Sequence, residues 1–136
     1  MRKFMIKRGL SGLGLVATAE IKRGERIVEY VGERIDDAEA DRRTSRYIFE
    51  VTKDLNIDGK SRKNLARYVN HSCRPNCSYR IIGTRVYYHA KRAIHPGEEL
   101  TVDYGQDYFD FYIKAFGCRC GAAHHRGQGK NGRKNP

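Results

Sequence analysis

The most informative segment of the 136-residue chain reads Asn64-Leu-Ala-Arg-Tyr-Val-Asn-His-Ser-Cys-Arg-Pro-Asn-Cys77. Residues 65–69 have the pattern of a buried segment, and a dense run of polar residues, Asn70 to Cys77, follows at once. Asn, His and Ser side chains are buried only where they find hydrogen-bond partners. The run therefore indicates either a functional site or a closely bonded structural knot, whereas Asn-His-Ser alone is typical of an ordinary polar loop.

The chain has four cysteines: Cys73, Cys77, Cys118 and Cys120. A disulfide between the last two would be strained, because their side chains point apart. Thiolates and imidazoles are the usual ligands of structural zinc, and two histidines, His124 and His125, follow closely. The spacing predicts a zinc site with Cys118, Cys120, one of these histidines and either Cys73 or Cys77. Free thiols in a loose basic tail are the alternative.

The segment Gly12-Leu-Gly14 is a second candidate for ligand binding, because glycines let backbone N–H groups approach a ligand closely. A dinucleotide-binding loop would need a long helix after the glycines. Here Gly24 arrives ten residues later and a strand pattern follows, which excludes that helix. The doublet predicts a backbone contact with a ligand or a plain tight turn.

Length and composition predict one soluble globular domain, with 39% hydrophobic and 32% charged residues. No apolar run approaches the roughly 18 residues that span a bilayer. Residues 1–10 lack the apolar stretch of a secretory signal. We therefore expect neither a membrane protein nor one exported by a classical signal, and the compartment is left open between cytoplasm and nucleus, with secretion into a host as the alternative.

The net charge of +11 is concentrated at the two ends of the chain. Residues 1–19 and 111–136 hold basic residues and no acidic ones, whereas residues 20–110 are nearly neutral. A nucleic-acid-binding protein is expected to carry its charge on a folded face. Solvated basic ends are therefore the preferred interpretation, and contact with nucleic acid is the alternative.

Residues rich in β-branched and aromatic side chains predict strands at 26–31, 46–51, 85–90 and 99–104. Alanines and charges favour a short helix over 36–43, and a second short helix is predicted over 108–116. The fold class is therefore mostly β, with short strands, few short helices and long connections.

Taken in chain order, the motifs resemble those of the SET-domain protein lysine methyltransferases over roughly residues 9–127. Gly12-Leu-Gly14 is similar to the family's first glycine motif, and Glu29-Tyr-Val-Gly-Glu33 to its EYxGE strand. The 64–77 segment is similar to the RFxNHSCxPNC signature, and Gly97-Glu-Glu-Leu-Thr-Val-Asp-Tyr104 to GEELTxDY. Cys118-Arg-Cys120-Gly121 resembles the start of the zinc-binding post-SET segment.

The resemblance implies a SET-domain fold of short curved sheets with a pseudoknot, S-adenosylmethionine as cofactor, and a protein lysine as substrate, with histone tails the first expectation. The implied cofactor-binding residues are Gly12, Leu13, Gly14, Arg67, Asn70, His71 and Tyr104. The implied catalytic residues are Tyr104, Tyr30 and Tyr79, the last two as walls of a lysine channel. The implied zinc ligands are Cys73, Cys118, Cys120 and His125, where His125 replaces the family's third post-SET cysteine.

The same resemblance divides the chain into a basic lead (1–8), a SET domain (9–116), a post-SET-like zinc segment (117–127) and a disordered basic tail (128–136). Two alternatives to an active enzyme stay open. One is a catalytically silent SET-fold module that binds a basic peptide, and the other is a small basic nucleic-acid-associated protein.

Methyl transfer from a sulfonium requires a neutral amine, whereas a free lysine has a pKa near 10.4. A narrow apolar channel and a neighbouring sulfonium both lower that pKa. Because a tyrosine phenol itself has a pKa near 10, we expect Tyr104 to orient the amine rather than to act as a full base. Acidic side chains at Glu50, Asp54, Asp107 and Asp110 are candidates to flank a groove for a basic peptide.

Overall fold

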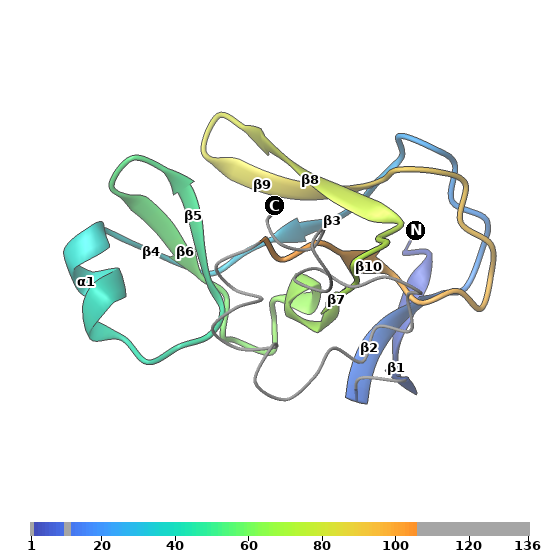
Figure 1. Ribbon diagram of the computed structural model, residues 1–136, viewed down its shortest axis with the longest axis horizontal. Helices are drawn as coiled ribbons and strands as arrows, with labels where there is room; N and C mark the ends of the chain where they lie inside the picture. Colours follow the sequence, from blue (N-terminus) through green and yellow to red (C-terminus); the bar gives the residue numbers. More distant parts are fainter. Residues whose placement is uncertain (1, 10–11, 106–136) are drawn as a thin grey trace, which may run out of the picture.

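A computed structural model describes residues 2–9 and 12–105, which form four small sheets, one short α-helix and one 3-10 turn (Figure 1). The strands are β1 (Phe4–Gly9), β2 (Gly12–Ala17), β3 (Arg26–Tyr30), β4 (Glu33–Ile35), β5 (Ile48–Thr52), β6 (Leu55–Asp58), β7 (Asn70–His71), β8 (Cys77–Ile82), β9 (Arg85–Ala90) and β10 (Thr101–Val102). The helix is α1 (Asp37–Arg42), and the turn is η1 (Leu65–Tyr68). The expectation of a mostly β fold is confirmed.

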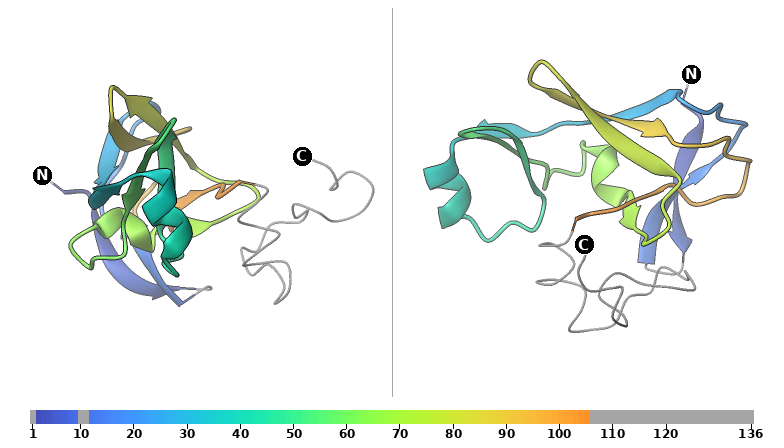
Figure 2. Two further views of the ribbon diagram at one scale, coloured as in Figure 1. Left: turned by 90° about the vertical axis from the view of Figure 1, so that its left-hand side faces the viewer. Right: turned by 45° about the horizontal axis from the view of Figure 1, so that its top comes forward.

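Three of the sheets are antiparallel: the hairpin β1–β2, the sheet β3–β9–β8 and the sheet β4–β6–β5. The fourth pairs β7 with β10 in parallel. The sheet β4–β6–β5, with α1 beside it, lies at one end of the molecule. The hairpin β1–β2 lies at the opposite end, in both Figure 1 and the right-hand view of Figure 2. Between these ends, η1 and the β7–β10 pair lie beneath the β8–β9 hairpin.

The hydrophobic core fills the centre, where the sheets face one another, because burying apolar surface is the main stabilising term of a small domain. Its most completely buried side chains are Leu15, Ile21, Ile57, Val69, Val86, Ile94 and Leu100. Isolated bridges between Val16 and Glu99 and between Ile21 and Ile94 tie residues 94–100 back to the N-terminal part of the chain.

The parallel pair β7–β10 is reinforced by a single buried side chain, that of Asn76. Its Oδ1 accepts from the Thr101 amide at 2.9 Å, and its Nδ2 donates to the Glu99 carbonyl at 2.8 Å. The Ser72 amide also donates to the Val102 carbonyl at 3.0 Å. The 64–77 segment is therefore a closely bonded knot, and it crosses the strand that precedes Tyr104.

The predicted strands at 26–31 and 85–90 are confirmed as β3 and β9, and the predicted helix is confirmed as α1. The strand predicted at 46–51 is β5, which begins two residues later. The strand predicted over 99–104 is wrong in length, because β10 has only two residues. Two amides of the predicted segment donate to side chains rather than to a neighbouring strand: Thr101 N to Asn76 Oδ1 and Tyr104 N to His71 Nδ1.

Several strands were not predicted, and β1 includes residues 4–8, which the sequence analysis assigned to a basic lead. Gly12-Leu-Gly14 starts β2 and pairs with β1 rather than forming only a tight turn. The helix expected at 108–116 and the segments 117–127 and 128–136 lie outside the described residues.

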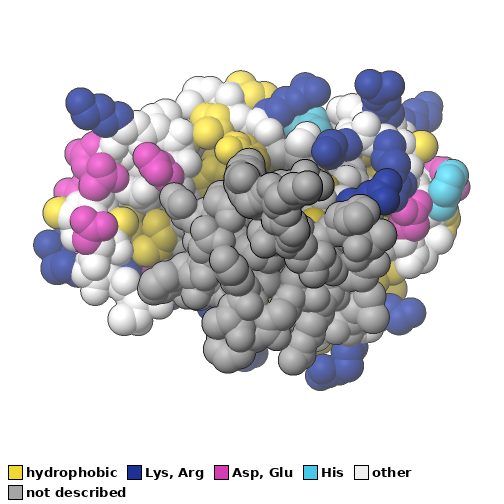
Figure 3. All heavy atoms as spheres, viewed as in Figure 1, with side chains coloured by type: hydrophobic (Ala, Val, Ile, Leu, Met, Phe, Trp, Pro, Cys, Tyr) yellow, Lys and Arg dark blue, Asp and Glu magenta, His cyan; other side chains and the backbone are white. Residues whose placement is uncertain are grey.

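The described residues carry their charges unevenly. On the face shown in Figure 3, acidic side chains gather at the end that holds α1, and most Lys and Arg side chains lie toward the opposite end. Within the part of the chain that the structure describes, no helix has both the length and the apolarity to span a membrane.

We expect Asn64→Leu to destabilise the fold by about 2–4 kcal/mol, because it removes the partners of two backbone groups, one of which belongs to the buried Gly59. Asn64 is fully buried; its Nδ2 donates to the Gly59 carbonyl at 3.0 Å and its Oδ1 accepts from the Val31 amide at 3.1 Å. Urea unfolding measures the change. Lys63→Ala, at an exposed neighbouring position, is the control, and an equal small effect of both substitutions would contradict this account.

Candidate active site

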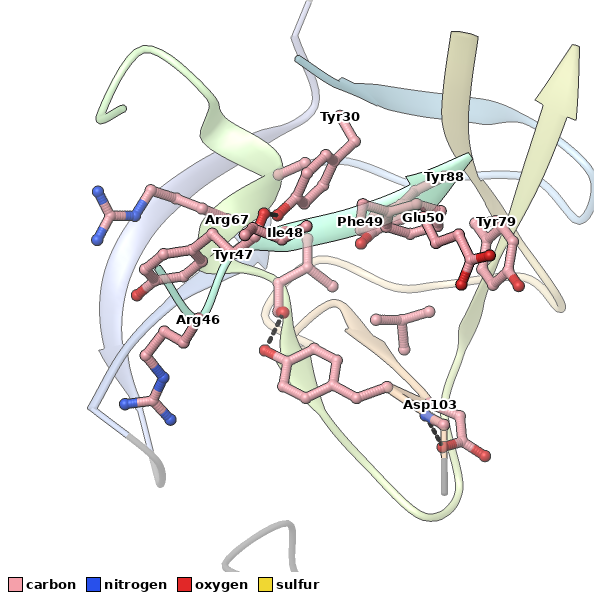
Figure 4. Close-up of a pocket in the computed structure, with 15 residues that line it drawn as sticks. Tyr30, Arg46, Tyr47, Ile48, Phe49, Glu50, Arg67, Tyr79, Tyr88 and Asp103 are labelled. Atoms are coloured by element: carbon pink, nitrogen blue, oxygen red, sulfur yellow. Dashed lines mark hydrogen bonds between the residues drawn. The ribbon is translucent and has the colours of Figure 1, made fainter. Parts of the chain in front are cut away.

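A pocket of about 510 Å³ opens between β5, η1, the β8–β9 hairpin and residues 102–105. Its aromatic walls are Tyr30, Tyr47, Phe49, Tyr79, Tyr88 and Tyr104. Figure 4 shows Arg46, Tyr47 and Arg67 on one side and Glu50, Tyr79 and Asp103 on the other. The three tyrosines that the sequence analysis singled out, at 30, 79 and 104, therefore share one pocket.

Tyr104 is fixed at both ends by backbone and side-chain hydrogen bonds. Its hydroxyl donates to the Val69 carbonyl at 2.7 Å, the bond drawn in Figure 4, and its amide donates to His71 Nδ1 at 3.1 Å. The rings of His71 and Tyr104 lie 5.4 Å apart. His71 Nδ1 thus serves as the acceptor for this amide, and the carboxylate of Asp103 lies 3.8 Å from the same nitrogen.

Tyr30 is buried at the end of β3, and its hydroxyl donates to the Tyr47 carbonyl. Its ring packs against Phe49 and Tyr88, at centroid distances of 5.3 and 6.2 Å. Burial raises the pKa of Tyr88 well above its ordinary value, and the neighbouring phenols of Tyr30 and Tyr104 add to the shift. This wall of the pocket therefore stays uncharged at neutral pH.

Tyr79 lies at the open edge of the pocket, with 48% of its surface exposed. Its ring meets Phe49 edge to face at 5.0 Å. Of the acidic residues expected to flank a groove, Glu50 lines this pocket. Asp54 instead accepts from the Asp37 amide at the start of α1, and Asp107 and Asp110 lie outside the described residues.

Arg67 lines the tyrosine pocket as well. Its guanidinium lies 4.3 Å from the centre of the Tyr47 ring and 5.3 Å from that of Tyr68, and one of its terminal nitrogens donates to the Lys60 carbonyl. Its Nε is buried without a hydrogen-bond partner. The structure therefore places the Arg67 guanidinium against the aromatic wall of the pocket.

The glycine motif at the start of β2 and Asn70 in β7 contact each other. Asn70 Nδ2 donates to the Leu13 carbonyl at 3.0 Å and to Glu99 Oε2 at 2.8 Å. A Cβ on Gly14 would lie 2.4 Å from Glu99 Oε2 and 3.0 Å from Asn70 Nδ2, so a larger residue here would displace these two side chains. Gly12, Leu13, Gly14, Asn70 and the adjoining His71 are thus brought together, as expected for residues that share one ligand.

The cysteines of the 64–77 segment have different surroundings. His71 Nε2 lies 3.3 Å from Cys73 Sγ. Cys77 is buried, its thiol donates to Asn76 Oδ1 at 3.3 Å, and burial raises its pKa to about 12. Among the described residues, no three metal-ligating side chains form a cluster. Cys118, Cys120, His124 and His125 lie outside these residues.

The family model of the SET domain matches residues 12–105, which is most of the chain. The chain belongs to the SET-domain family. Two histone-lysine N-methyltransferases of Arabidopsis thaliana are similar to this SET domain: ASHH3, 41% identical over 85% of the chain, and ASHH1, 43% identical over 87%. A third relative is the "Histone-lysine N-methyltransferase, H3 lysine-4 specific" of Schizosaccharomyces pombe, 37% identical over 85% of the chain.

The SET domain matches only part of each relative: 36% of ASHH3, 26% of ASHH1 and 14% of the Schizosaccharomyces pombe protein. The family membership confirms the resemblance and the fold class expected from the sequence.

Sequence reasoning missed two tyrosines that line the pocket, Tyr47 and Tyr88, and the buried Asn64, which bonds the Val31 amide and the Gly59 carbonyl. Tyr47 and Tyr88 lie within the predicted strands, where a tyrosine is usually a packing residue. A weak signal existed for Asn64, because it stands immediately before the apolar run 65–69 and within the signature segment.

We expect the Cys77 thiol to resist alkylation by iodoacetamide in the native protein at mildly alkaline pH, because burial raises its pKa to about 12 and the thiolate is the reactive form. Mass spectrometry of the digested protein measures the modified fraction. Unfolding in guanidinium chloride should restore full reactivity. Rapid modification of native Cys77 would contradict the burial described here.

Proposed function

We propose that this SET domain transfers a methyl group from S-adenosylmethionine to the side-chain amine of a protein lysine. The observation that carries the proposal is the connection between two sites. Residues 69–71 contribute Asn70 to the glycine-motif cluster and the Val69 carbonyl to the tyrosine pocket, where it accepts the Tyr104 hydroxyl. A ligand at the cluster and a side chain in the pocket would thus both contact residues 69–71.

The residues of the cluster fit the cofactor. The Asn70 amide nitrogen is used by Leu13 and Glu99, and no protein group among the described residues bonds its amide oxygen. That oxygen is available to accept a hydrogen bond from an ammonium group. We assign Gly12 to Gly14, Asn70, the His71 backbone and Tyr104 to cofactor binding. The backbone of His71 is named rather than its ring, because both ring nitrogens already face protein atoms. When bound, S-adenosylmethionine supplies an electrophilic methyl group on a sulfonium.

The tyrosine pocket suits a lysine amine that must become neutral and be aimed. Its aromatic walls desolvate the ammonium form, which lowers the pKa of the lysine. The same walls attract a cation, which draws the lysine in but opposes its deprotonation. The hydroxyls of Tyr30 and Tyr104 donate their protons to the backbone carbonyls of Tyr47 and Val69. Their oxygens therefore accept N–H from the amine and orient its lone pair.

We propose a basic peptide, such as a histone tail, as the substrate. Glu50 and Asp103 line the pocket on the same side and provide carboxylates for Lys and Arg neighbours of the target lysine. The relatives ASHH3 and ASHH1 are named histone-lysine N-methyltransferases, which supports this class of substrate.

We also propose that zinc is held by Cys73, Cys118, Cys120 and His125, and that residues 117–127 form this zinc segment after a SET domain of residues 9–116. The choice of Cys73 over Cys77 is supported by their surroundings. Zinc binds the thiolate, and the pKa of Cys77, raised to about 12, makes its thiolate costly to form.

The methyl-transfer proposal predicts that the purified chain methylates lysines in core histones or arrayed tail peptides. Tyr104→Phe should lower kcat by about a hundredfold, because an amine displaced from its line of attack reacts far more slowly. Radiolabelled S-adenosylmethionine measures transfer, and calorimetry measures cofactor binding. Tyr87→Phe is the matched control, since Tyr87 stacks under Arg26 and does not line the pocket.

Wild-type protein that binds the cofactor but methylates no lysine would contradict this proposal. That result would favour a catalytically silent module of the same fold.

The zinc proposal predicts one zinc ion per chain and its loss in Cys73→Ser. Cys77→Ala is the matched control and should retain the ion. Elemental analysis of the purified variants measures both. Zinc retained by Cys73→Ser, or lost equally in both variants, would contradict the assignment of Cys73.

A further inference from the structure

A buried carboxylate, that of Asp58 at the end of β6, lies in the sheet β4–β6–β5, whose strand β5 lines the tyrosine pocket. Asp58 is 2% exposed; it accepts from the Ser45 hydroxyl at 2.7 Å, from Arg43 at 3.1 Å and from the Lys60 amide at 3.3 Å. Burial alone would raise the pKa of Asp58, but the hydrogen bonds from Ser45, Arg43 and a backbone amide outweigh it and lower the pKa. Asp58 therefore stays ionised and keeps the hydroxyl proton of Ser45.

Ser45 links this carboxylate to Tyr47. Because its proton points at Asp58, the Ser45 oxygen is left to accept, and it receives the Tyr47 amide at 3.1 Å. The carbonyl of Tyr47 accepts from the Gly59 amide at 2.9 Å. Both sides of the Tyr47 backbone are thus fastened to the two consecutive residues Asp58 and Gly59.

The same anchor locates the phenol end of Tyr30. A Cβ on Gly59 would lie 2.6 Å from both Cε1 and Cζ of the Tyr30 ring, so the ring packs directly against the glycine backbone. The Tyr30 hydroxyl donates to the Tyr47 carbonyl, which the Gly59 amide also holds. The direction of the hydroxyl proton therefore depends on where Ser45 and Asp58 hold Tyr47.

We infer that Ser45 and Asp58 are positioning residues for the proposed methyl transfer, acting through the Tyr47 carbonyl on the Tyr30 hydroxyl. This inference rests on the proposed function. While the carbonyl holds the hydroxyl proton, the Tyr30 oxygen only accepts N–H from the lysine amine. A Tyr30 hydroxyl released from the carbonyl donates to the amine lone pair instead, and an amine whose lone pair is occupied cannot attack the methyl group.

Removing the Ser45 hydroxyl tests whether Ser45 positions the Tyr30 hydroxyl. Ser45→Ala should lower kcat about fivefold, the order expected for one lost hydrogen bond, with the cofactor Kd and the peptide KM unchanged. Ser45→Thr keeps a hydroxyl and should restore kcat. Glu39→Gln is the matched control, since Glu39 pairs with the same Arg43 at 2.8 Å on the outer side, away from Tyr47.

A double-mutant cycle with Tyr30→Phe separates positioning from general loss of stability. If Ser45 acts through the Tyr30 hydroxyl, Ser45→Ala should have no further effect on kcat once that hydroxyl is gone. Independent, multiplying losses in the double variant, or a fall in kcat for Glu39→Gln equal to that for Ser45→Ala, would overturn the inference.

A second readout does not need turnover. In protein labelled with 13C at the tyrosine ζ carbon, the Tyr30 resonance, assigned with Tyr30→Phe, should shift in Ser45→Ala and stay in place in Glu39→Gln. An inactive wild type that shows this shift would refute the proposed function and leave the Ser45–Tyr47–Tyr30 linkage intact. An unmoved resonance would overturn the linkage, whatever the activity.

Discussion

The parallel pairing of β7 with β10 is the contact on which the candidate active site depends. It joins Asn70 and His71 to Thr101 and Val102, about thirty residues further along the chain. Two-residue strands cannot stand alone, because so short a ladder does not offset the entropy of closing the loop between them. Here the Asn76 side chain adds bonds to the Glu99 carbonyl and the Thr101 amide, and the fully buried Leu100 anchors the same stretch in the core.

This crossing explains how one short segment serves two sites. The Asn70 side chain reaches the Leu13 carbonyl, whereas the carbonyl just before it, that of Val69, accepts the Tyr104 hydroxyl. His71 closes the arrangement by accepting the Tyr104 amide. The polar run is therefore a closely bonded knot, and its hydrogen bonds hold the groups of the candidate site in place.

The sequence predicted those parts of the fold that depend on local composition. Strand β9, with its run of Val and Tyr, matched its predicted limits, and α1 begins after Asp36, whose side chain accepts from the Glu39 amide as a helix cap. The short strands β7 and β10 could not be predicted from local composition, because they pair across about thirty residues and because the amides of Thr101 and Tyr104 bond to side chains. The same holds for the anchor of Tyr47, which joins Ser45 to Asp58 across thirteen positions.

The site itself was predicted chiefly through the family resemblance, which grouped Tyr30, Tyr79 and Tyr104 before any geometry was known. The structure adds how each ring is held. The Tyr30 hydroxyl donates to the Tyr47 carbonyl, the Tyr104 hydroxyl donates to the Val69 carbonyl, and the Tyr79 ring packs edge to face with Phe49. It also adds the packing of the Arg67 guanidinium on the Tyr47 ring, which no motif specifies because the contact depends on how η1 lies against the segment before β5.

Amide hydrogen exchange at Thr101 and Tyr104 tests most directly whether the β7–β10 crossing is the rigid support of the site. Both amides donate to side chains of the 64–77 segment, at 2.9 and 3.1 Å. The account predicts that they exchange only when the core opens, with the same free energy of opening as the amides of β9. Exchange at the rate of an unstructured peptide, while β9 stays protected, would show that the crossing opens by itself and would contradict it.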